Sequence, residues 1–186
     1  MALVGAESVA AEEDVREGAE AEVAAKRTPA AREKAMIGVR VGTSNNHNAE
    51  IYYKCELLGA VSLPWAWRSK SGWGFSLRVD FTAAVLNGGP DWAFLGSVVP
   101  SFFLLKEQWR LALDGGIGPA LLSRYRFGET DNLGGHFQFY SHAGLTYLVR
   151  RNLTVGYQWQ HLSNAGIYSP NPGINFHSLQ LAYLFW

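Results

Sequence analysis

The sequence is poor in features on which several protein classes depend. Its 186 residues include a single cysteine, Cys55, which excludes an internal disulfide framework, and no group of Cys and His residues has the spacing of a zinc site. Its 16 basic and 16 acidic side chains cancel, so the basic surface of a nucleic-acid-binding protein is not expected. No apolar run approaches the ~18 residues of a transmembrane helix. The sequence is instead rich in glycine, with 20, and in aromatic residues, at 13%, which is typical of β proteins with short turns.

Strict alternation of apolar and polar residues dominates the chain after residue 35. This period of two is typical of strands with one apolar face. In residues 73–85, for example, Leu77 and Val79 share one face while Arg78 and Asp80 share the other. Eight segments follow the pattern: 37–41, 51–57, 73–85, 92–104, 109–117, 137–147, 153–159 and 179–185. The pattern predicts an all-β domain of eight antiparallel strands over residues 36–186.

Alternation alone does not decide which face points inward. A soluble barrel that binds an apolar ligand buries its apolar face, whereas an outer-membrane barrel turns that face to lipid. Charges of both signs stand on the polar face, where a small barrel's interior would pair them: Arg40, Lys54, Glu56, Arg78, Asp80, Arg110 and Asp114. Five tryptophans stand at predicted strand ends, as in an interfacial aromatic girdle: Trp73, Trp92, Trp109, Trp159 and Trp186. We therefore predict an eight-stranded antiparallel transmembrane β-barrel in a bacterial outer membrane, with the soluble barrel as the alternative.

The first 35 residues differ from the rest of the chain. They are rich in alanine and glutamate, hold eight acids against five bases and contain no aromatic residue. They carry no apolar stripe, so we predict a short solvated tail, disordered or partly helical. The tail does not resemble the signal peptide that an exported protein needs, because it has no basic leader and Glu7 interrupts its short apolar stretch. A misassigned start codon or a replaced leader would explain this conflict.

A pair of polar residues stands out at the end of the seventh predicted strand. If the N-terminus lies in the periplasm, this end is at the cell surface. His161 and Ser163 continue the parity of Val155 and Trp159, so both are predicted to face lipid, where polar groups are costly unless they have a function. Spaced i and i+2, they project side by side, close enough for the imidazole to take a proton from the hydroxyl. A serine activated by histidine is an acyl-transfer nucleophile, so a lipid ester is the expected substrate.

The run His161-Leu162-Ser163-Asn164-Ala165-Gly166, followed by Pro170-Asn171-Pro172-Gly173-Ile174-Asn175, resembles the signature of the lipid A 3-O-deacylases of the PagL type. The resemblance is specific over residues 161–175, looser over the rest of the barrel and absent from residues 1–35. It implies an eight-stranded outer-membrane barrel with a His/Ser/Glu triad on its outer surface, which hydrolyses the ester of a hydroxyacyl chain at the 3 position of lipid A. It also implies that Ser163 is the nucleophile and His161 the general base. Asn164 and the backbone amides of Asn164, Ala165 and Gly166 would then stabilise the oxyanion.

The sequence departs from the family pattern at Asn175, which stands where the best-known members carry glutamate. Its parity on the last strand matches that of Leu179 and Leu181, so it is predicted to face outward beside His161. An amide can orient an imidazole but supplies no charge to stabilise the imidazolium. We therefore expect a Ser/His dyad with Asn175 as its orienting residue, slower than a relative with glutamate.

Two loop arginines are candidates for substrate binding. Arg124 and Arg126 lie in the long loop between the fifth and sixth predicted strands, at the same end as Ser163. Arginine binds lipid A phosphates well through bidentate hydrogen bonds, although solvated loop charges are the alternative.

The expected partners are lipid A of lipopolysaccharide and the outer membrane, and the formation of a homodimer is left open. The mechanism requires no cofactor and no metal. One competing interpretation is a structural or adhesion barrel without catalysis, in which His161 and Ser163 are ordinary hydrogen-bonding residues. Another is a relative that cuts a different lipid ester, because the motif defines chemistry better than substrate.

Overall fold

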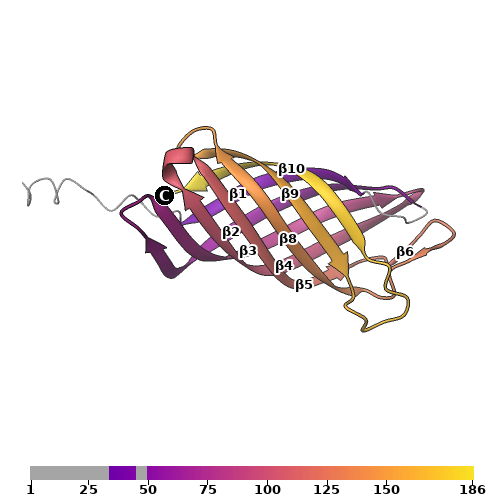
Figure 1. Ribbon diagram of the computed structural model, residues 1–186. Helices are drawn as coiled ribbons and strands as arrows, with labels where there is room; N and C mark the ends of the chain where they lie inside the picture. Colours follow the sequence, from indigo (N-terminus) through magenta and orange to yellow (C-terminus); the bar gives the residue numbers. More distant parts are fainter. Residues whose placement is uncertain (1–33, 45–49) are drawn as a thin grey trace, which may run out of the picture. The chain divides into compact units, whose positions relative to one another are not determined.

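The computed structural model describes residues 34–44 and 50–186, in which eight long strands form a closed barrel. In chain order these are β1 (Ala35–Ser44), β2 (Tyr52–Arg68), β3 (Trp73–Gly88), β4 (Asp91–Lys106), β5 (Leu111–Leu122), β8 (Phe137–Leu148), β9 (Leu153–Ser163) and β10 (Ile174–Phe185). Consecutive strands pair antiparallel, and β1 closes the barrel on β10 (Figure 1). The predicted eight-stranded antiparallel barrel is confirmed. Nearly all of the predicted tail lies outside the described residues, so its boundary stays a prediction.

Three short elements lie outside the barrel wall. The strands β6 (Arg126–Phe127) and β7 (Asp131–Asn132) form a hairpin of their own within the connection from β5 to β8. The 3-10 helix η1 (Glu107–Trp109) turns the chain between β4 and β5. Over the described part of the chain, no helix is long and apolar enough to cross a membrane.

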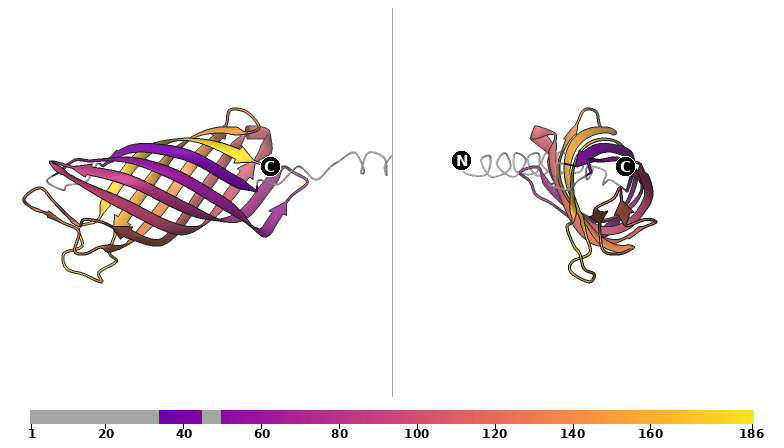
Figure 2. Two further views of the ribbon diagram at one scale, coloured as in Figure 1. Left: turned by 180° about the vertical axis from the view of Figure 1, so that it is seen from behind. Right: turned by 90° about the vertical axis from the view of Figure 1, so that its right-hand side faces the viewer.

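The connections give the barrel two different ends. At one end, called the loop end, the connections 45–51, 123–136 and 164–173 are long. At the other, called the turn end, residues 69–72, 107–110 and 149–152 make tight turns beside the start of β1 and the end of β10. In Figure 1 the turn end is on the left with the C-terminus and the loop end is on the right; Figure 2 shows the closed ring of strands from the loop end.

The apolar face of every strand points outward. Along β10, for example, Leu179, Leu181 and Tyr183 are exposed while the residues between them are buried. Phe94 is 70% exposed and Ile117 63%, although both are large apolar residues on well-formed strands. Such a surface is stable only against lipid, so the alternative of a soluble barrel with a buried apolar face is wrong.

The polar face fills the interior with two ion-pair clusters. The first is centred on Glu56, whose carboxylate contacts Arg40 and Lys54 at 2.8 Å each and accepts a hydrogen bond from the Tyr140 hydroxyl at 2.7 Å. Lys54 Nζ also donates to Gln160 at 2.6 Å. These contacts connect β1, β2, β8 and β9 across the middle of the barrel.

The second cluster connects β3, β5 and β8. The Arg78 guanidinium lies 3.0 Å from Asp80 and 3.6 Å from Asp114, and His142 lies 3.5 and 3.7 Å from the same two carboxylates. Thr146 donates to Asp114 at 3.0 Å. The interior therefore holds three basic and three acidic side chains, all buried: Arg40, Lys54, Arg78, Glu56, Asp80 and Asp114. Paired charges of this kind are what allow ionisable groups to remain inside a barrel.

Two sequence-based placements were wrong. Arg110 does not enter the interior, because the chain leaves η1 at this residue in a left-handed conformation (φ 55°), and its exposed guanidinium donates to the Val149 carbonyl. Trp159 does not mark a strand end, since β9 continues to Ser163. Both errors arise where local backbone geometry changes the length or phase of a strand.

The charge on Glu56 should be essential to the barrel's stability. Glu56→Gln leaves Arg40 and Lys54 as uncompensated buried cations, so we expect a loss of roughly 3–5 kcal/mol in the free energy of unfolding. Urea titration, followed by the different gel mobility of folded and unfolded barrel, measures it. The control is Cys55→Ala at the neighbouring, lipid-facing position, which should change that free energy by less than about 1 kcal/mol. Equal losses in the two variants would contradict a role for the ion pairs.

Candidate active site

The antiparallel pairing of β9 with β10 brings His161 and Asn175 together at the loop end. His161 lies directly opposite Asn175 in this antiparallel pair. Both side chains point outward, because Leu162 beside His161 and both neighbours of Asn175, Ile174 and Phe176, are fully buried. These three apolar residues belong to the cluster that fills the loop end of the interior. The inward residues thus hold the two strands in the register that the outward pair requires.

The imidazole of His161 is held on three sides. Its Nδ1 is 2.7 Å from Asn175 Oδ1. The indole of Trp159 stacks alongside it, with ring centroids 6.0 Å apart and an interplanar angle of 13°. The backbone of Gly173 (φ 64°) lies against its edge, so that a Cβ there would be 2.9 Å from His161 Cε1. A ring with this support has a single defined orientation.

The hydrogen bond to Asn175 also selects the tautomer of His161. A carboxamide oxygen only accepts hydrogen bonds, so the proton of the neutral imidazole lies on Nδ1. The lone pair is then on Nε2, the nitrogen that a general base needs.

Ser163 is the last residue of β9 and is half-buried beside Phe139 of β8. Within the described residues, the structure records no hydrogen bond between its hydroxyl and His161. Catalytic hydrogen bonds often form only when substrate is bound. Ser163 therefore remains the candidate nucleophile because it projects from the same face of β9 as His161, two residues away. The structure also reveals Ser141, which sequence reasoning missed. It lies opposite His161 on the β8 side, so a second hydroxyl flanks the imidazole.

Asn164 organises the loop that follows Ser163. Its buried carboxamide donates to the carbonyls of Leu133 and Pro170, at 2.9 and 3.0 Å, and accepts from the backbone N–H of Gly166 at 2.9 Å. Its own backbone N–H donates to Asn171 Oδ1 at 3.0 Å. The side chain of Asn164 is thus occupied in holding two loops together, which is a supporting role.

Of the three backbone amides predicted to stabilise an oxyanion, two are already engaged. The amides of Asn164 and Gly166 make the hydrogen bonds just given. For Ala165, whose φ of 53° turns the chain sharply after Ser163, the described residues provide no hydrogen-bond acceptor. Its exposed N–H is therefore the amide of this turn that is available to a ligand.

The outward polar residues continue one step further along the strands. The Tyr157 hydroxyl and His177 Nδ1 form a hydrogen bond, and His177 lies two residues beyond Asn175 on β10. The two polar side chains thus continue the line of outward polar residues from His161 along β9 and β10.

The two loop arginines differ in their surroundings. Arg124 forms an ion pair with Asp91, at the start of β4, so its charge is already compensated. Arg126 is exposed on β6, with its guanidinium 5.8 Å from the centre of the Tyr125 ring. Arg126 is therefore the more available of the two for an anionic ligand.

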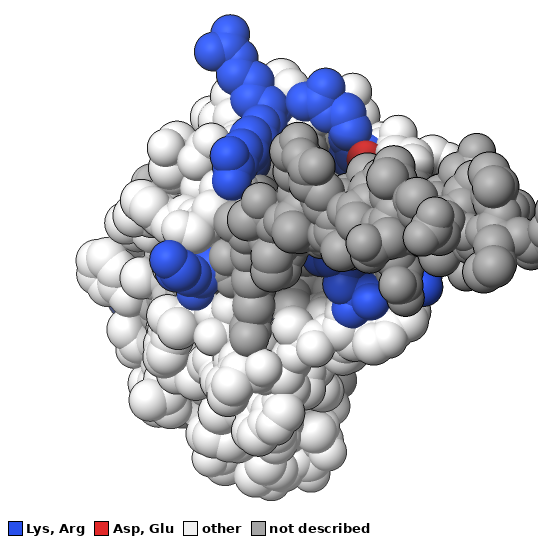
Figure 3. All heavy atoms as spheres, turned by 90° about the vertical axis from the view of Figure 1, so that its left-hand side faces the viewer, with Lys and Arg blue, Asp and Glu red and all other residues white. Residues whose placement is uncertain are grey.

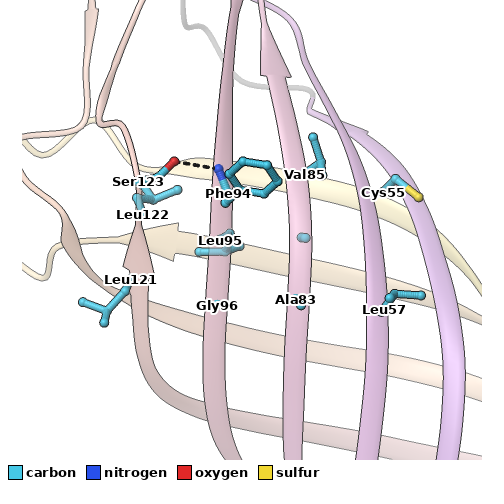
Figure 4. Close-up of a pocket in the computed structure, with 11 residues that line it drawn as sticks. Cys55, Leu57, Ala83, Val85, Phe94, Leu95, Gly96, Leu121, Leu122 and Ser123 are labelled. Carbon is cyan, nitrogen blue, oxygen red and sulfur yellow. Dashed lines mark hydrogen bonds between the residues drawn. The ribbon is translucent and has the colours of Figure 1, made fainter.

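An apolar groove on the barrel wall is distant from this site. A groove of about 670 Å³ lies on the outer surface of strands β2 to β5, and Figure 4 shows it between Cys55, Leu57, Phe94 and Leu121. Those strands occupy the side of the barrel away from β9 and β10. The groove thus takes no part in the site. No three His, Cys, Asp or Glu side chains of the described residues are arranged to hold a metal ion.

A family model described as lipid A 3-O-deacylase (PagL) matches residues 47–184, which include every strand of the barrel except β1. The chain belongs to the lipid A 3-O-deacylase family. The lipid A deacylase PagL of Bordetella bronchiseptica is 30% identical over 129 residues, which make up 65% of this chain and 70% of that relative. The crystal structure of the outer membrane enzyme PagL has the same fold, with a TM-score of 0.66 and 24% identity over 79% of this chain and 97% of that one.

The resemblance drawn from residues 161–175 is therefore confirmed for the family, and so is the outer-membrane location of this deacylase-family barrel. The roles of the individual residues are a separate matter, which depends on the geometry of His161, Ser163 and Asn175.

The close approach of Gly173 to His161 should be essential for activity. Gly173→Ala places a methyl group against the imidazole and strains a left-handed backbone, so we expect a loss of ester hydrolysis on the order of 10²-fold with the barrel still folded. The control is Gly72→Ala, which has a similar φ of +77° but lies at the turn end and should change the rate by less than about threefold. Rates of lipid A hydrolysis in detergent measure both. Equal effects would show that strain, rather than contact with His161, limits the rate.

Proposed function

We propose that the protein removes the ester-linked acyl chain at position 3 of lipid A, with Ser163 as nucleophile, His161 as general base and Asn175 as its orienting residue. The observation that carries the proposal is the 2.7 Å hydrogen bond between His161 and Asn175 on the lipid-facing surface. Ser163 lies two residues from His161 on the same strand, β9. Family membership supports acyl hydrolysis as the reaction and lipid A as the substrate.

The first half of the reaction acylates the enzyme. Ser163 Oγ attacks the ester carbonyl carbon while its proton passes to His161 Nε2, and the Ala165 N–H donates to the oxyanion that forms. Collapse of this intermediate breaks the bond between the carbonyl carbon and the sugar oxygen. The sugar oxygen takes the proton from Nε2, and the acyl group remains on Ser163.

The second half returns the enzyme to its starting state. A water molecule loses a proton to His161 Nε2 and attacks the acyl carbon. Collapse of the second intermediate releases the fatty acid, and Ser163 Oγ recovers its proton from Nε2. Throughout both halves Asn175 keeps Nδ1 hydrogen-bonded, but it supplies no charge when the imidazole becomes positive.

The placement of the site suits a substrate that never leaves the membrane. The acyl chain would lie along the exposed apolar wall beside Phe139 and Trp159, while the sugar and phosphates would lie at the loop end. Arg126, exposed on the hairpin of that end, is our candidate contact for a phosphate. Arg124 is a weaker one because Asp91 already pairs with it.

Ser163 and Ser141 form a matched pair for testing the nucleophile. Ser163→Ala should lower lipid A deacylation by about 10³-fold or more, because the Oγ atom of Ser163 forms the acyl-enzyme in the proposed mechanism. Ser141→Ala, next to the same imidazole, should stay within about threefold of wild type. The full chain is folded in detergent, and loss of one hydroxyacyl chain from lipid A is measured by mass spectrometry.

The reverse pattern would make Ser141 the nucleophile. A wild-type protein that leaves lipid A intact, with both variants identical to it, would favour the structural barrel without catalysis. Hydrolysis of simple phospholipid esters but not lipid A would instead indicate a different lipid substrate.

Replacing the amide of Asn175 by a carboxylate should improve the catalyst. Asn175→Glu adds a charge that stabilises the imidazolium in both halves of the reaction, so kcat should rise by roughly tenfold or more. Asn175→Leu removes the hydrogen bond to Nδ1 and should lower kcat, which provides the opposite control. Lower activity in both variants would show that the carboxamide has a function that glutamate cannot supply.

A further inference from the structure

The charges of the barrel are distributed very unevenly between its two ends. The buried charges of the interior cancel, so the electrostatic potential around the barrel depends on the surface charges at its two ends. Seven basic side chains stand at the turn end: Lys34, Arg68, Lys70, Lys106, Arg110, Arg150 and Arg151. Among the described residues at that end, the sole acidic side chain is Glu107, which forms an ion pair with Arg68. Figure 3 looks onto the turn end and shows the lysine and arginine side chains spread around its rim.

The loop end has the opposite balance. Its described basic residues are Arg124 and Arg126, whereas its described acidic residues number four: Glu50, Asp91, Glu129 and Asp131. The turn end is thus a basic surface, although the whole chain is neutral.

The basic residues of the turn end are interleaved with aromatic residues. Lys106 Nζ lies 4.9 Å from the centre of the Trp73 ring and 5.8 Å from that of Trp109. The Arg151 guanidinium lies 5.9 Å from the Trp186 ring. Tryptophans that face outward at the edge of an apolar wall lie at the depth of lipid headgroups. Trp109 is 62% exposed, as such a position requires, and Lys106 beside it therefore lies at headgroup depth as well. Trp186 instead packs against the inward-facing cluster at this end of the barrel, so it holds Arg151 at the rim.

We propose that the turn end is a binding surface for the phosphates of anionic phospholipids. It comprises the seven basic residues named above, and from here on it is called the basic belt. Cations held at headgroup depth meet the lipid phosphate directly, and each one near an anionic membrane surface strengthens binding by about fivefold. Phospholipid, and not lipid A, is the ligand because His161 and Ser163 lie at the opposite end of the barrel, which the proposed reaction places among lipopolysaccharide. In this choice of ligand the proposal rests on the proposed function.

The basic belt assigns a leaflet to each end of the barrel. In an outer membrane the inner leaflet is built of phospholipid and the outer leaflet of lipopolysaccharide. Anchoring the turn end in the phospholipid leaflet places the loop end, with His161 and Ser163, in the lipopolysaccharide leaflet. The belt thus supplies a physical reason for the orientation that lipid A hydrolysis needs.

The test measures lipid preference in the folded, full-length chain. The protein is reconstituted into phosphatidylcholine vesicles that contain either brominated phosphatidylglycerol or brominated phosphatidylcholine, and quenching of tryptophan fluorescence gives the relative affinity for the two lipids. Wild type should prefer phosphatidylglycerol by about fivefold or more at low salt, and high salt should weaken the preference. Equal quenching by the two lipids would overturn the proposal.

Two variants show which end of the barrel causes the preference for phosphatidylglycerol. The first replaces Lys34, Lys70, Arg150 and Arg151 by Gln; none of these side chains makes a hydrogen bond or ion pair with another described residue, so the barrel should fold. Its preference should fall well below that of the wild type, although three cations of the belt remain. The control is Arg124→Gln with Arg126→Gln at the loop end, which should keep the wild-type preference. Loss of preference in the control, with retention in the first variant, would overturn the proposal.

Deacylation of detergent-solubilised lipid A separates this proposal from the catalytic one. The belt variant should hydrolyse lipid A at the wild-type rate, because its substitutions lie at the end of the barrel away from Ser163. An inactive wild type with a clear phospholipid preference would refute the proposed function and support the belt. The converse result, activity without lipid preference, would refute the belt alone.

Discussion

The neutralisation of charge inside the barrel is the constraint on which the rest of the structure depends. Because the outer wall faces lipid, each charged side chain on the inward face must find its partner inside. Glu56 does this for two strands at once, through Arg40 and Lys54, and Tyr140 extends the contact across the barrel to β8. With these pairs in place the strands have one permitted register, since a slip of one residue would expose every charge to lipid.

That register is what creates the candidate active site. Inward Leu162, Ile174 and Phe176 anchor the ends of β9 and β10, and the outward residues between them, His161 and Asn175, meet as a direct consequence. The site is thus built on two rigid strands, with Gly173 and Trp159 defining the position of the imidazole. Its location on the wall, instead of in a pocket, fits a substrate that is itself part of the membrane.

The family comparison and the local geometry contribute different conclusions. Membership of the lipid A 3-O-deacylases establishes the class of reaction and the membrane, while the partner of His161 is learned from this chain's own geometry. Asn175 forms a hydrogen bond with His161 Nδ1 and brings no charge to it. At the turn end, the cations and tryptophans around the rim form the basic belt. By our proposal, this belt places the turn end in the phospholipid leaflet and the loop end in the lipopolysaccharide leaflet.

The sequence by itself determined the number of strands and the face that His161, Ser163 and Asn175 share with the apolar residues, because both follow from a period of two. The outward direction of that face followed from the charges on the opposite face and from the tryptophans at predicted strand ends. Arg110 and Trp159 were misplaced, since a left-handed residue after η1 and a longer β9 leave no mark on that period. Only the tertiary structure showed that Ser141 flanks His161, that Gly173 contacts its ring and that Asn164 is occupied in joining two loops. These are contacts between segments distant in the chain, which depend on the closure of the barrel and the register of its strands.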